Sequence, residues 1–116
     1  MPFRRGDVVL VLFPDSNLRT AKRRPALVVQ ASNLGSGLAQ TIIAMITSNQ
    51  ARAGHPSRVV ISLSSAAGRQ AGLLTDSVVM TDNLATVRDS EIDRVIGSLK
   101  DMSPVDEALR HTLGLN

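Results

Sequence analysis

The stretch Lys22-Arg23-Arg24-Pro25-Ala26-Leu27-Val28-Val29-Gln30 places three cations and a proline directly before an apolar run. Proline has no backbone N–H to donate to a sheet, and it favours an extended conformation in the residue before it. We therefore expect a loop that ends at Arg24 and a buried strand over residues 25–31. The three cations then lie at a strand mouth, where a guanidinium can bind a phosphate through two hydrogen bonds. A solvated basic loop is the alternative interpretation.

Further apolar runs of similar length predict the rest of a sheet. Polar, small or turn-forming residues separate these runs, so residues 64–72 are expected to form a flexible connection and residues 81–83 a turn. The segment 92–99 predicts either a strand or a switch from helix to strand. Six or so strands at this short spacing indicate a small β-barrel. The other expected strands are residues 8–13, 40–47, 58–63, 76–80 and 85–88.

The last segment has a different period and predicts one amphipathic helix. Ser103 is a suitable N-cap, Pro104 suits the first helical position, and Gly114 suits the end of the helix. The side chains expected on its apolar face are Val105, Leu109, Thr112 and Leu113.

The composition suits one globular domain over residues 1–116. The chain has 116 residues, of which 43% are hydrophobic, and this is enough for a core. It has no cysteine, which excludes disulfides, thiolate zinc sites and cysteine nucleophiles. No apolar run resembles a signal peptide or approaches the length of a membrane span. We therefore expect a cytoplasmic protein with no membrane partner.

Charge is distributed unevenly along the chain. Residues 1–75 hold nine Lys and Arg against two Asp and Glu, whereas residues 76–116 hold four against eight. A basic face for a polyanion would give this pattern, and so would two differently solvated surfaces. Because the aromatic residues are only Phe3 and Phe13, stacking of bases on a row of rings is not expected. Nucleic acid would be held through phosphate and polar base contacts.

The sequence gives no support for a metal site or for two common hydrolase motifs. His55 and His111 are the only histidines and they lie far apart in the sequence, so no pair of histidine ligands stands at a short spacing. We interpret His55 as a loop residue and His111 as a residue on the exposed face of the tail helix. The chain also lacks a phosphate-binding glycine loop and a nucleophile elbow.

The remaining candidates are polar side chains where strands end. They are Asn17 and Arg19 in the long loop 14–24, the cations Lys22 to Arg24, the cluster Thr47-Ser48-Asn49, and the pair Asp82-Asn83. Each alone has an ordinary structural explanation, since Thr is common in strands and Asp-Asn is common in turns.

Five stretches in series resemble the MazF/PemK toxin family, over roughly residues 4 to 115. They are Arg5-Gly6-Asp7-Val8-Val9-Leu10-Val11, Lys22-Arg23-Arg24-Pro25-Ala26-Leu27-Val28-Val29, Ile46-Thr47-Ser48-Asn49, Gly72-Leu73-Leu74-Thr75-Asp76-Ser77-Val78-Val79 and Val95-Ile96-Gly97-Ser98-Leu99. The resemblance implies a mainly β fold, a small SH3-like β-barrel of the CcdB/Kid type with an amphipathic C-terminal helix. It also implies a homodimer, inhibited by a cognate antitoxin, that acts as an mRNA interferase. Such an enzyme is a metal-independent, sequence-specific endoribonuclease that acts on single-stranded mRNA and needs no cofactor.

The resemblance also suggests which residues act. The family's arginine before its proline falls on Arg24, and the threonine that works with it in one branch falls on Thr47. Another branch has a catalytic Arg-x-Asp where this chain has Met80-Thr81-Asp82, so only the carboxylate remains. Asp82 or a second perturbed group is the candidate general base. The expected RNA-binding residues are Asn17, Arg19, Thr20, Lys22, Arg23, Ser48, Asn49 and Asn83.

Two other functions remain open from the sequence. The chain could be a non-catalytic toxin that inhibits DNA gyrase, similar to CcdB, or a module that binds RNA without cleaving it. A protein inhibitor has no need of a phosphate site, whereas the basic front half and the pair Arg24 and Thr47 favour an RNA substrate.

Overall fold

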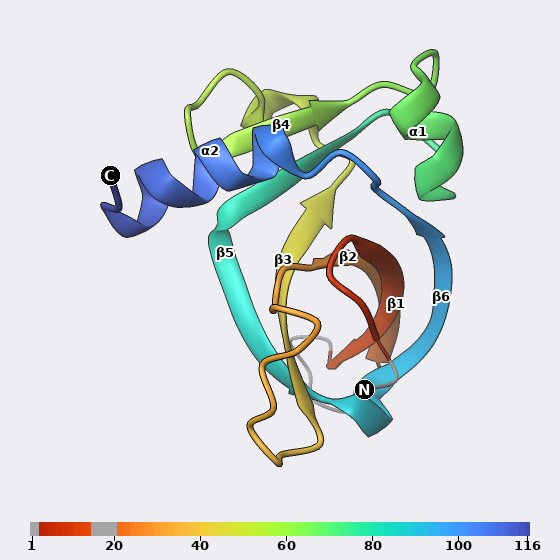
Figure 1. Ribbon diagram of the computed structural model, residues 1–116. Coiled ribbons are helices and arrows are strands. Elements are labelled where there is room, and N and C mark those ends of the chain that lie inside the picture. Colours follow the sequence, from red (N-terminus) through yellow and green to blue (C-terminus); the bar gives the residue numbers. More distant parts are fainter. Residues whose placement is uncertain (1–2, 15–20) are drawn as a thin grey trace.

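Six antiparallel strands in the described part of the chain form one sheet, in the order β4-β5-β3-β2-β1-β6 (Figure 1). The computed structural model describes residues 3–14 and 21–116. None of its helices is long and apolar enough to cross a membrane. The mainly β architecture with a C-terminal helix confirms the predicted fold class. In chain order the elements are β1 (Asp7–Pro14), β2 (Ala21–Val28), β3 (Gln40–Thr47), η1 (Gln50–Arg52), β4 (Arg58–Ile61), α1 (Ala66–Ala71), β5 (Ser77–Arg88), η2 (Asp89–Glu91), β6 (Ile92–Ser98) and α2 (Ser103–Leu113).

The sheet curls until strands that are distant in the sheet order share a core. Val87 of β5 and Ile92 of β6 are separated in the sheet by three strands, yet both pack in one cluster with Val9 and Val11 of β1. Figure 1 shows β5 and β6 bending around the central strands, joined at the bottom by η2. This closure produces the barrel-like shape that the strand spacing predicted.

The central strands are buried on both faces. Successive side chains of a strand point to opposite faces, so Val8 lies in a different cluster from Val9. The cluster around Val8 is covered by the two helices, through Ala71 of α1 and Val105 of α2. This two-sided burial explains why β1 and β3 are apolar along nearly their whole length.

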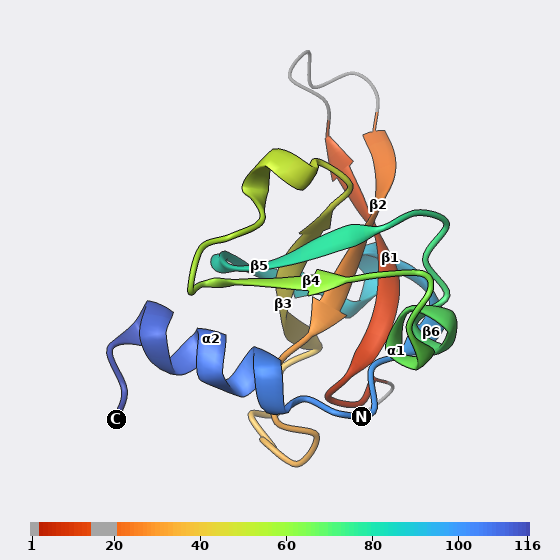
Figure 2. The ribbon, with the colours of Figure 1, turned by 90° about the horizontal axis from the view of Figure 1, so that it is seen from above.

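The sheet divides at Pro25. The Val29 N–H donates to the Ile42 carbonyl at 3.1 Å, and N–H groups alternate between the two sides of a strand. Position 25 is therefore one whose N–H would face β3, and proline has none. Pairing of β2 with β3 is confined to residues 26–28, whereas pairing with β1 continues to residue 21. Beyond Pro25, β2 pairs with β1 alone, and the ends of these two strands project from the barrel as a ribbon (Figure 2).

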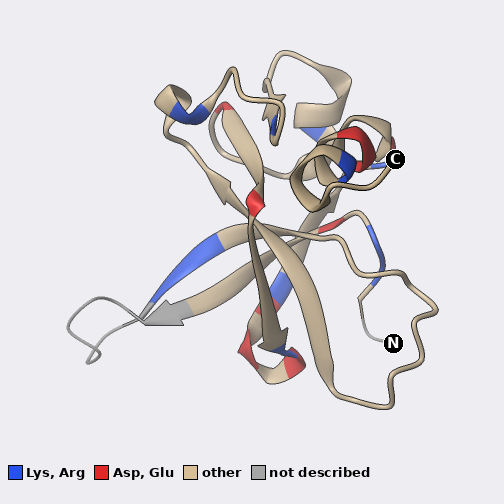
Figure 3. Cartoon of the chain, turned by 90° about the vertical axis from the view of Figure 1, so that its left-hand side faces the viewer, with Lys and Arg blue, Asp and Glu red and all other residues tan. Residues whose placement is uncertain are grey.

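The prediction that Lys22 to Arg24 end a loop was wrong. These residues belong to β2 and pair with β1, with Arg24 opposite Val11. The proline removes a hydrogen bond only on the edge that faces β3, so the strand does not begin at Pro25. The cations lie on the ribbon, where Figure 3 shows basic residues next to the part of the chain that is not described. They are exposed.

Three other predicted boundaries also change. β4 ends at Ile61, and the connection expected to be flexible contains α1, whose first turn is capped by the Ser65 hydroxyl accepting from the Gly68 N–H at 3.0 Å. β5 is continuous where a turn was expected. However, its register with β3 shifts between the pairs Ala44–Leu84 and Met45–Met80, so residues 81–83 have no partner in β3 and form a bulge.

The C-terminal helix α2 and its end at Gly114 (φ 68°) are confirmed. Met102 rather than Ser103 is the N-cap, and the Ser103 N–H donates to Asp101 Oδ1 at 3.0 Å. The buried residues of α2 are Val105 and Ala108, whereas Leu113 is exposed. Helix α2 is also joined to the N-terminal region, because Arg5 Nη2 lies 2.6 Å from Asp106 Oδ1.

Gly72 tests the close packing of α1 on β6. It has φ +71°, and a Cβ there would lie 2.0 Å from the Ile96 carbonyl oxygen. Gly72→Ala should lower the free energy of unfolding by roughly 2–5 kcal/mol, since overpacking adds to the cost of a left-handed alanine. Gly54→Ala is the matched control, because Gly54 has φ +86° with nothing within 4 Å of the new Cβ. It should lose only about 1–2 kcal/mol in urea unfolding. Equal losses for the two variants would contradict the close contact.

Candidate functional site

A cavity of 630 Å³ opens where β2 separates from β3, and we call it the polar groove. Its volume is within the range of ~300–1,000 Å³ that is usual for ligand sites. The fork at Pro25 supplies one side, the end of β3 and η1 supply another, and the bulge of β5 contributes Asn83. The lining residues are Arg23, Arg24, Pro25, Met45, Ile46, Thr47, Ser48, Asn49, Arg52, Met80, Asn83 and Ala85.

The polar groove brings together most of the predicted site residues that the structure describes. Arg24 of β2 and Thr47 of β3, which are far apart in the sequence, both line it. Arg23, Ser48, Asn49 and Asn83 line it too. Lys22 is exposed on the ribbon and does not line it. Asn17, Arg19 and Thr20 lie outside the described residues.

The Thr47 hydroxyl can still donate a hydrogen bond to a ligand. Its Oγ1 accepts a hydrogen bond from the Asn49 backbone N–H at 3.1 Å. A hydroxyl can accept and donate at the same time, so this contact fixes the oxygen and leaves the O–H as a donor. The side chain is only partly buried, at the wall of the groove. The arrangement suits hydrogen bonding to an anionic oxygen.

Asn49 has a structural contact and a free donor group. Its Oδ1 accepts from the Ala51 N–H at 3.1 Å and so caps η1. The amide NH₂ of the same side chain is left as a donor. The next residue, Gln50, donates from Nε2 to the Asp76 carbonyl at 3.0 Å. These contacts hold η1 against the sheet and place Arg52 at the groove.

Arg52 lines the polar groove and was not among the sequence candidates. A signal for it was present, because it is a cation two residues after the polar cluster 48–50. The short 3-10 turn that brings it back to the groove could not be inferred from the residue pattern alone. Arg23, Arg24 and Arg52 make the groove electropositive.

Asp82 does not line the groove, and its carboxylate is already engaged. Arg58 Nε donates to Asp82 Oδ1 at 3.1 Å, and Arg58 Nη2 donates to Oδ2 at 2.7 Å. This two-point hydrogen bonding to the guanidinium lowers the pKa of Asp82 from its ordinary value, with a small contribution from the charge of His55. A carboxylate held in this way is a weaker base. The general-base role therefore stays a prediction that this geometry does not favour.

His55 and His111 lie close together despite their distance in the sequence. Their ring centroids are 6.0 Å apart in an edge-to-face arrangement. His55 lies in a loop, as predicted, and its Nδ1 accepts from the Ser57 N–H at 3.0 Å. Nearby, the hydroxyls of Thr81 and Thr112 are 2.8 Å apart. These contacts join α2 to β5, and none of the four residues lines the polar groove.

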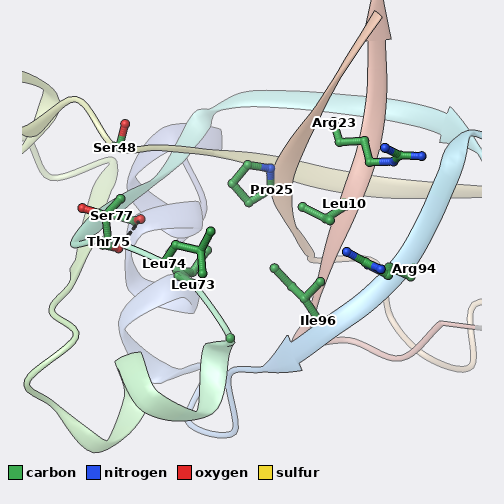
Figure 4. A pocket seen from close by; sticks show the side chains of 11 residues that line it. Leu10, Arg23, Pro25, Ser48, Leu73, Leu74, Thr75, Ser77, Arg94 and Ile96 are labelled. Atoms are coloured by element: carbon green, nitrogen blue, oxygen red, sulfur yellow. Dashed lines mark hydrogen bonds between the residues drawn. The ribbon is translucent and has the colours of Figure 1, made fainter.

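A second cavity, which we call the apolar groove, adjoins the first (Figure 4). It has a volume of 520 Å³ and shares Arg23, Pro25 and Ser48 with the polar groove. Arg23 and Arg94 lie at one end of it, and Arg23 Nε is 3.1 Å from Asp93 Oδ2. Leu74 is 97% exposed, which is unusual for a large apolar side chain. The other lining residues are Leu10, Gly72, Leu73, Thr75, Ser77 and Ile96.

Comparison with known proteins identifies the family. A family model described as a PemK-like, MazF-like toxin of type II toxin-antitoxin systems matches residues 4–113. The chain belongs to this family. Among curated PemK/MazF proteins, it is 36% identical over 107 residues to endoribonuclease MazF2 of Mycobacterium bovis and to endoribonuclease MazF6 of Mycobacterium tuberculosis. Each alignment covers 90% of both chains.

Solved structures of PemK/MazF toxins have the same fold. A mycobacterial endoribonuclease in complex with its cognate antitoxin superimposes with a TM-score of 0.75 at 22% identity, covering 98% of this chain and 97% of that one. A chain of a MazE-MazF crystal structure from Deinococcus radiodurans gives a TM-score of 0.73 at 20% identity, with 100% of both chains covered. The barrel expected from the sequence is thus confirmed as the PemK/MazF fold.

The ion pair of Asp82 predicts a specific acid sensitivity. Because the folded-state pKa of Asp82 is lowered, the stabilisation is present above the unfolded-state pKa of about 3.9 and is lost as the pH falls through the folded value. Wild type should therefore be more stable than Asp82→Asn at pH 6, and this difference should shrink below about pH 4 in urea unfolding.

The control for that experiment is Glu107→Gln, which removes the charge of a 77% exposed carboxylate on α2. Its difference from wild type should change less with pH, because it has no two-point contact with a guanidinium. If the difference for Asp82→Asn were constant between pH 6 and pH 3, the ion pair would not exist in solution.

Proposed function

We propose that this toxin is an endoribonuclease that cleaves single-stranded mRNA at specific sequences and needs no metal ion. The supporting observation is that Arg24 and Thr47 line one electropositive groove together with Ser48, Asn49 and Asn83. A guanidinium and a hydroxyl donor beside amide side chains suit a phosphate flanked by unpaired bases. The endoribonuclease relatives support the same assignment.

The reaction begins with attack of the 2′-oxygen on the adjacent phosphorus. A P–O2′ bond forms, the P–O5′ bond breaks, and the products carry a 2′,3′-cyclic phosphate and a 5′-hydroxyl. Negative charge accumulates on the non-bridging oxygens before the bond breaks. Arg24 would stabilise this charge, and the Thr47 hydroxyl would donate to one of these oxygens. DNA lacks the 2′-hydroxyl and would bind without reacting.

Binding of the RNA would use the other groove residues. Arg23 would contact the phosphate backbone together with Lys22, which is exposed on the ribbon outside the groove lining. Such contacts fix register but carry no sequence information. The Ser48 hydroxyl and the amides of Asn49 and Asn83 can hydrogen-bond to base edges. Asn17, Arg19 and Thr20, from the loop between β1 and β2, are proposed to add further contacts. Sequence preference would then depend on the amide and loop residues.

The proton of the 2′-hydroxyl needs an acceptor, for which the sequence predicted Asp82. Its carboxylate accepts two hydrogen bonds from Arg58 and lies outside the groove lining. We therefore assign Asp82 to positioning: water takes the proton of the 2′-hydroxyl, and water also donates the proton that converts the departing 5′-oxygen to a hydroxyl. Arg24 would act by electrostatics and not as an acid, because a guanidinium keeps its proton in proteins.

The partners we propose are a second copy of the chain and a cognate antitoxin. An acidic, partly apolar antitoxin segment could occupy the apolar groove and pair with Arg23, which also lines the polar groove. RNA and antitoxin would then compete for this arginine. Unchanged antitoxin affinity in Arg23→Ala would contradict that account, and a monomer by light scattering would contradict the dimer.

The test of the activity is incubation of the purified protein with a long single-stranded RNA in EDTA, followed by mapping of the fragment ends. Discrete cuts with 2′,3′-cyclic phosphate or 3′-phosphate ends are expected, with the equivalent DNA intact. Arg24→Ala and Thr47→Val should each slow cleavage by roughly 10²–10³-fold, because each removes a donor to the developing charge. Thr47→Ser should retain most activity.

The matched control is Arg110→Ala, which removes an exposed arginine on α2. It should cleave as wild type does. Melting temperatures of the Arg24 and Thr47 variants should stay close to that of wild type, since Arg24 is exposed on the ribbon. Intact RNA with folded wild-type protein would overturn the proposal and leave RNA binding without cleavage or inhibition of a protein target.

A further inference from the structure

Arg52 gives the polar groove a second cationic position that comes from a different element than Arg24. Arg24 is in β2, whereas Arg52 ends η1, directly after β3. Both line the same cavity of 630 Å³. A single strand of nucleic acid carries one phosphate for each nucleotide, so a groove that follows the strand contacts more than one of them.

The backbone at Arg52 is fixed by contacts that leave its guanidinium unused. Asn49 caps the turn, Gln50 donates to the Asp76 carbonyl, and Arg58 Nη1 donates to the Arg52 carbonyl at 3.1 Å. Within the described residues, the Arg52 guanidinium makes no hydrogen bond or ion pair. A positioned main chain with an uncommitted cation is the arrangement expected of a ligand-binding arginine.

Arg58 contacts both the turn that carries Arg52 and the bulge of β5. It lies directly opposite Met80 in the antiparallel pair β4–β5, and opposed side chains point to the same face. Met80 lines the polar groove, so Arg58 lies on the same face of the sheet. Its donors bind Asp82 on one side and the Arg52 carbonyl on the other. The side chain is only 19% exposed.

The contact between Arg58 and Asp82 also helps to hold the bulge of β5, residues 81–83, in place. Residues 81–83 have no ladder partner in β3, and contacts with other parts of the chain hold them, including a backbone hydrogen bond from the Thr81 N–H to the Ser57 carbonyl at 3.0 Å. Thr81 Oγ1 donates to the Ser57 carbonyl at 2.7 Å, and Asp82 is bound by Arg58. Asn83, the third bulge residue, lines the groove. One guanidinium therefore binds both Asp82, which precedes Asn83, and the carbonyl of Arg52.

We infer that Arg52 binds a second backbone phosphate of the RNA, and that Arg58 and Asp82 form a positioning pair that fixes Arg52 and Asn83 in the groove. This inference rests on the proposed endoribonuclease function. It divides the cations by role: Arg24 acts at the phosphate that reacts, whereas Arg52 acts at a phosphate that stays intact. Loss of Arg52 then affects KM, and loss of Arg24 affects kcat.

The first experiment measures Arg52→Ala against wild type on an RNA that contains the mapped cleavage sequence. KM should rise about tenfold, the size expected for a charged hydrogen bond, with kcat within about twofold of wild type. Binding is measured separately on the same RNA with one 2′-deoxy nucleotide at the cleavage site. The slope of log K against log salt should be less steep by about 0.7 in Arg52→Ala, since one phosphate contact is lost.

The charge control is Lys100→Ala, which removes an exposed cation outside both grooves. Its KM and salt slope should equal those of wild type. If wild type cleaves RNA and Arg52→Ala has an unchanged KM and an unchanged slope, the inference is wrong while the proposed function holds. If wild type does not cleave, the proposed function fails, and the slopes on the intact RNA still decide whether Arg52 contacts a phosphate.

The positioning pair is tested with Arg58→Lys and Asp82→Asn. Neither is proposed to touch RNA, yet each should raise KM several-fold and leave kcat nearly unchanged. The double variant Arg52→Ala/Asp82→Asn should raise KM by less than the product of the two single effects, because the part of the Asp82→Asn effect that passes through Arg52 is already lost. A fall in kcat of about 10²-fold or more for Asp82→Asn would instead make Asp82 the general base and overturn the positioning role. Thermal unfolding identifies any variant whose fold is lost.

Discussion

The absence of a backbone N–H at Pro25 determines where the sheet divides. A residue with an N–H at this position could extend the pairing of β2 with β3 toward Ile46, and the two strands would run together to their ends. With proline there, β2 stays paired only with β1 and carries Arg24 away from β3. The end of β3 is left with Thr47 and Ser48 facing a cavity. The groove is thus a direct consequence of one missing hydrogen-bond donor.

In β5 the pairing with β3 is interrupted by three extra residues, 81–83, which have no partner in β3. The three bulge residues 81–83 each have a different role: Thr81 joins β5 to Ser57 and α2, Asp82 pairs with Arg58, and Asn83 reaches the groove. A bulge that is held by β4 and α2 keeps its shape without a partner in β3. The groove is therefore bordered by a strand that leaves the sheet and by a strand that bulges within it.

Local sequence patterns predicted those features that depend on neighbouring residues. The bounds of β3, the existence of β1, β6 and α2, and the end of α2 at Gly114 follow from apolar runs and turn residues. The start of β2 could not be predicted this way, because it depends on which edge of Pro25 faces a partner. Arg58 was missed because its importance arises from its place opposite Met80, which only the register of β4 with β5 reveals. Arg52 was missed because only the fold of η1 brings its side chain to the polar groove.

The uneven distribution of charge along the chain has a structural explanation that the sequence did not indicate. Three ion pairs join a cation of the front half to a carboxylate of the back half: Arg5 with Asp106, Arg23 with Asp93, and Arg58 with Asp82. The acidic residues are therefore partly used to connect the two halves of the fold. In the described part of the chain, Arg24 and Arg52 have no such partner, and both line the polar groove. A ligand that brings negative charge to this groove would therefore gain most from these two unpaired cations.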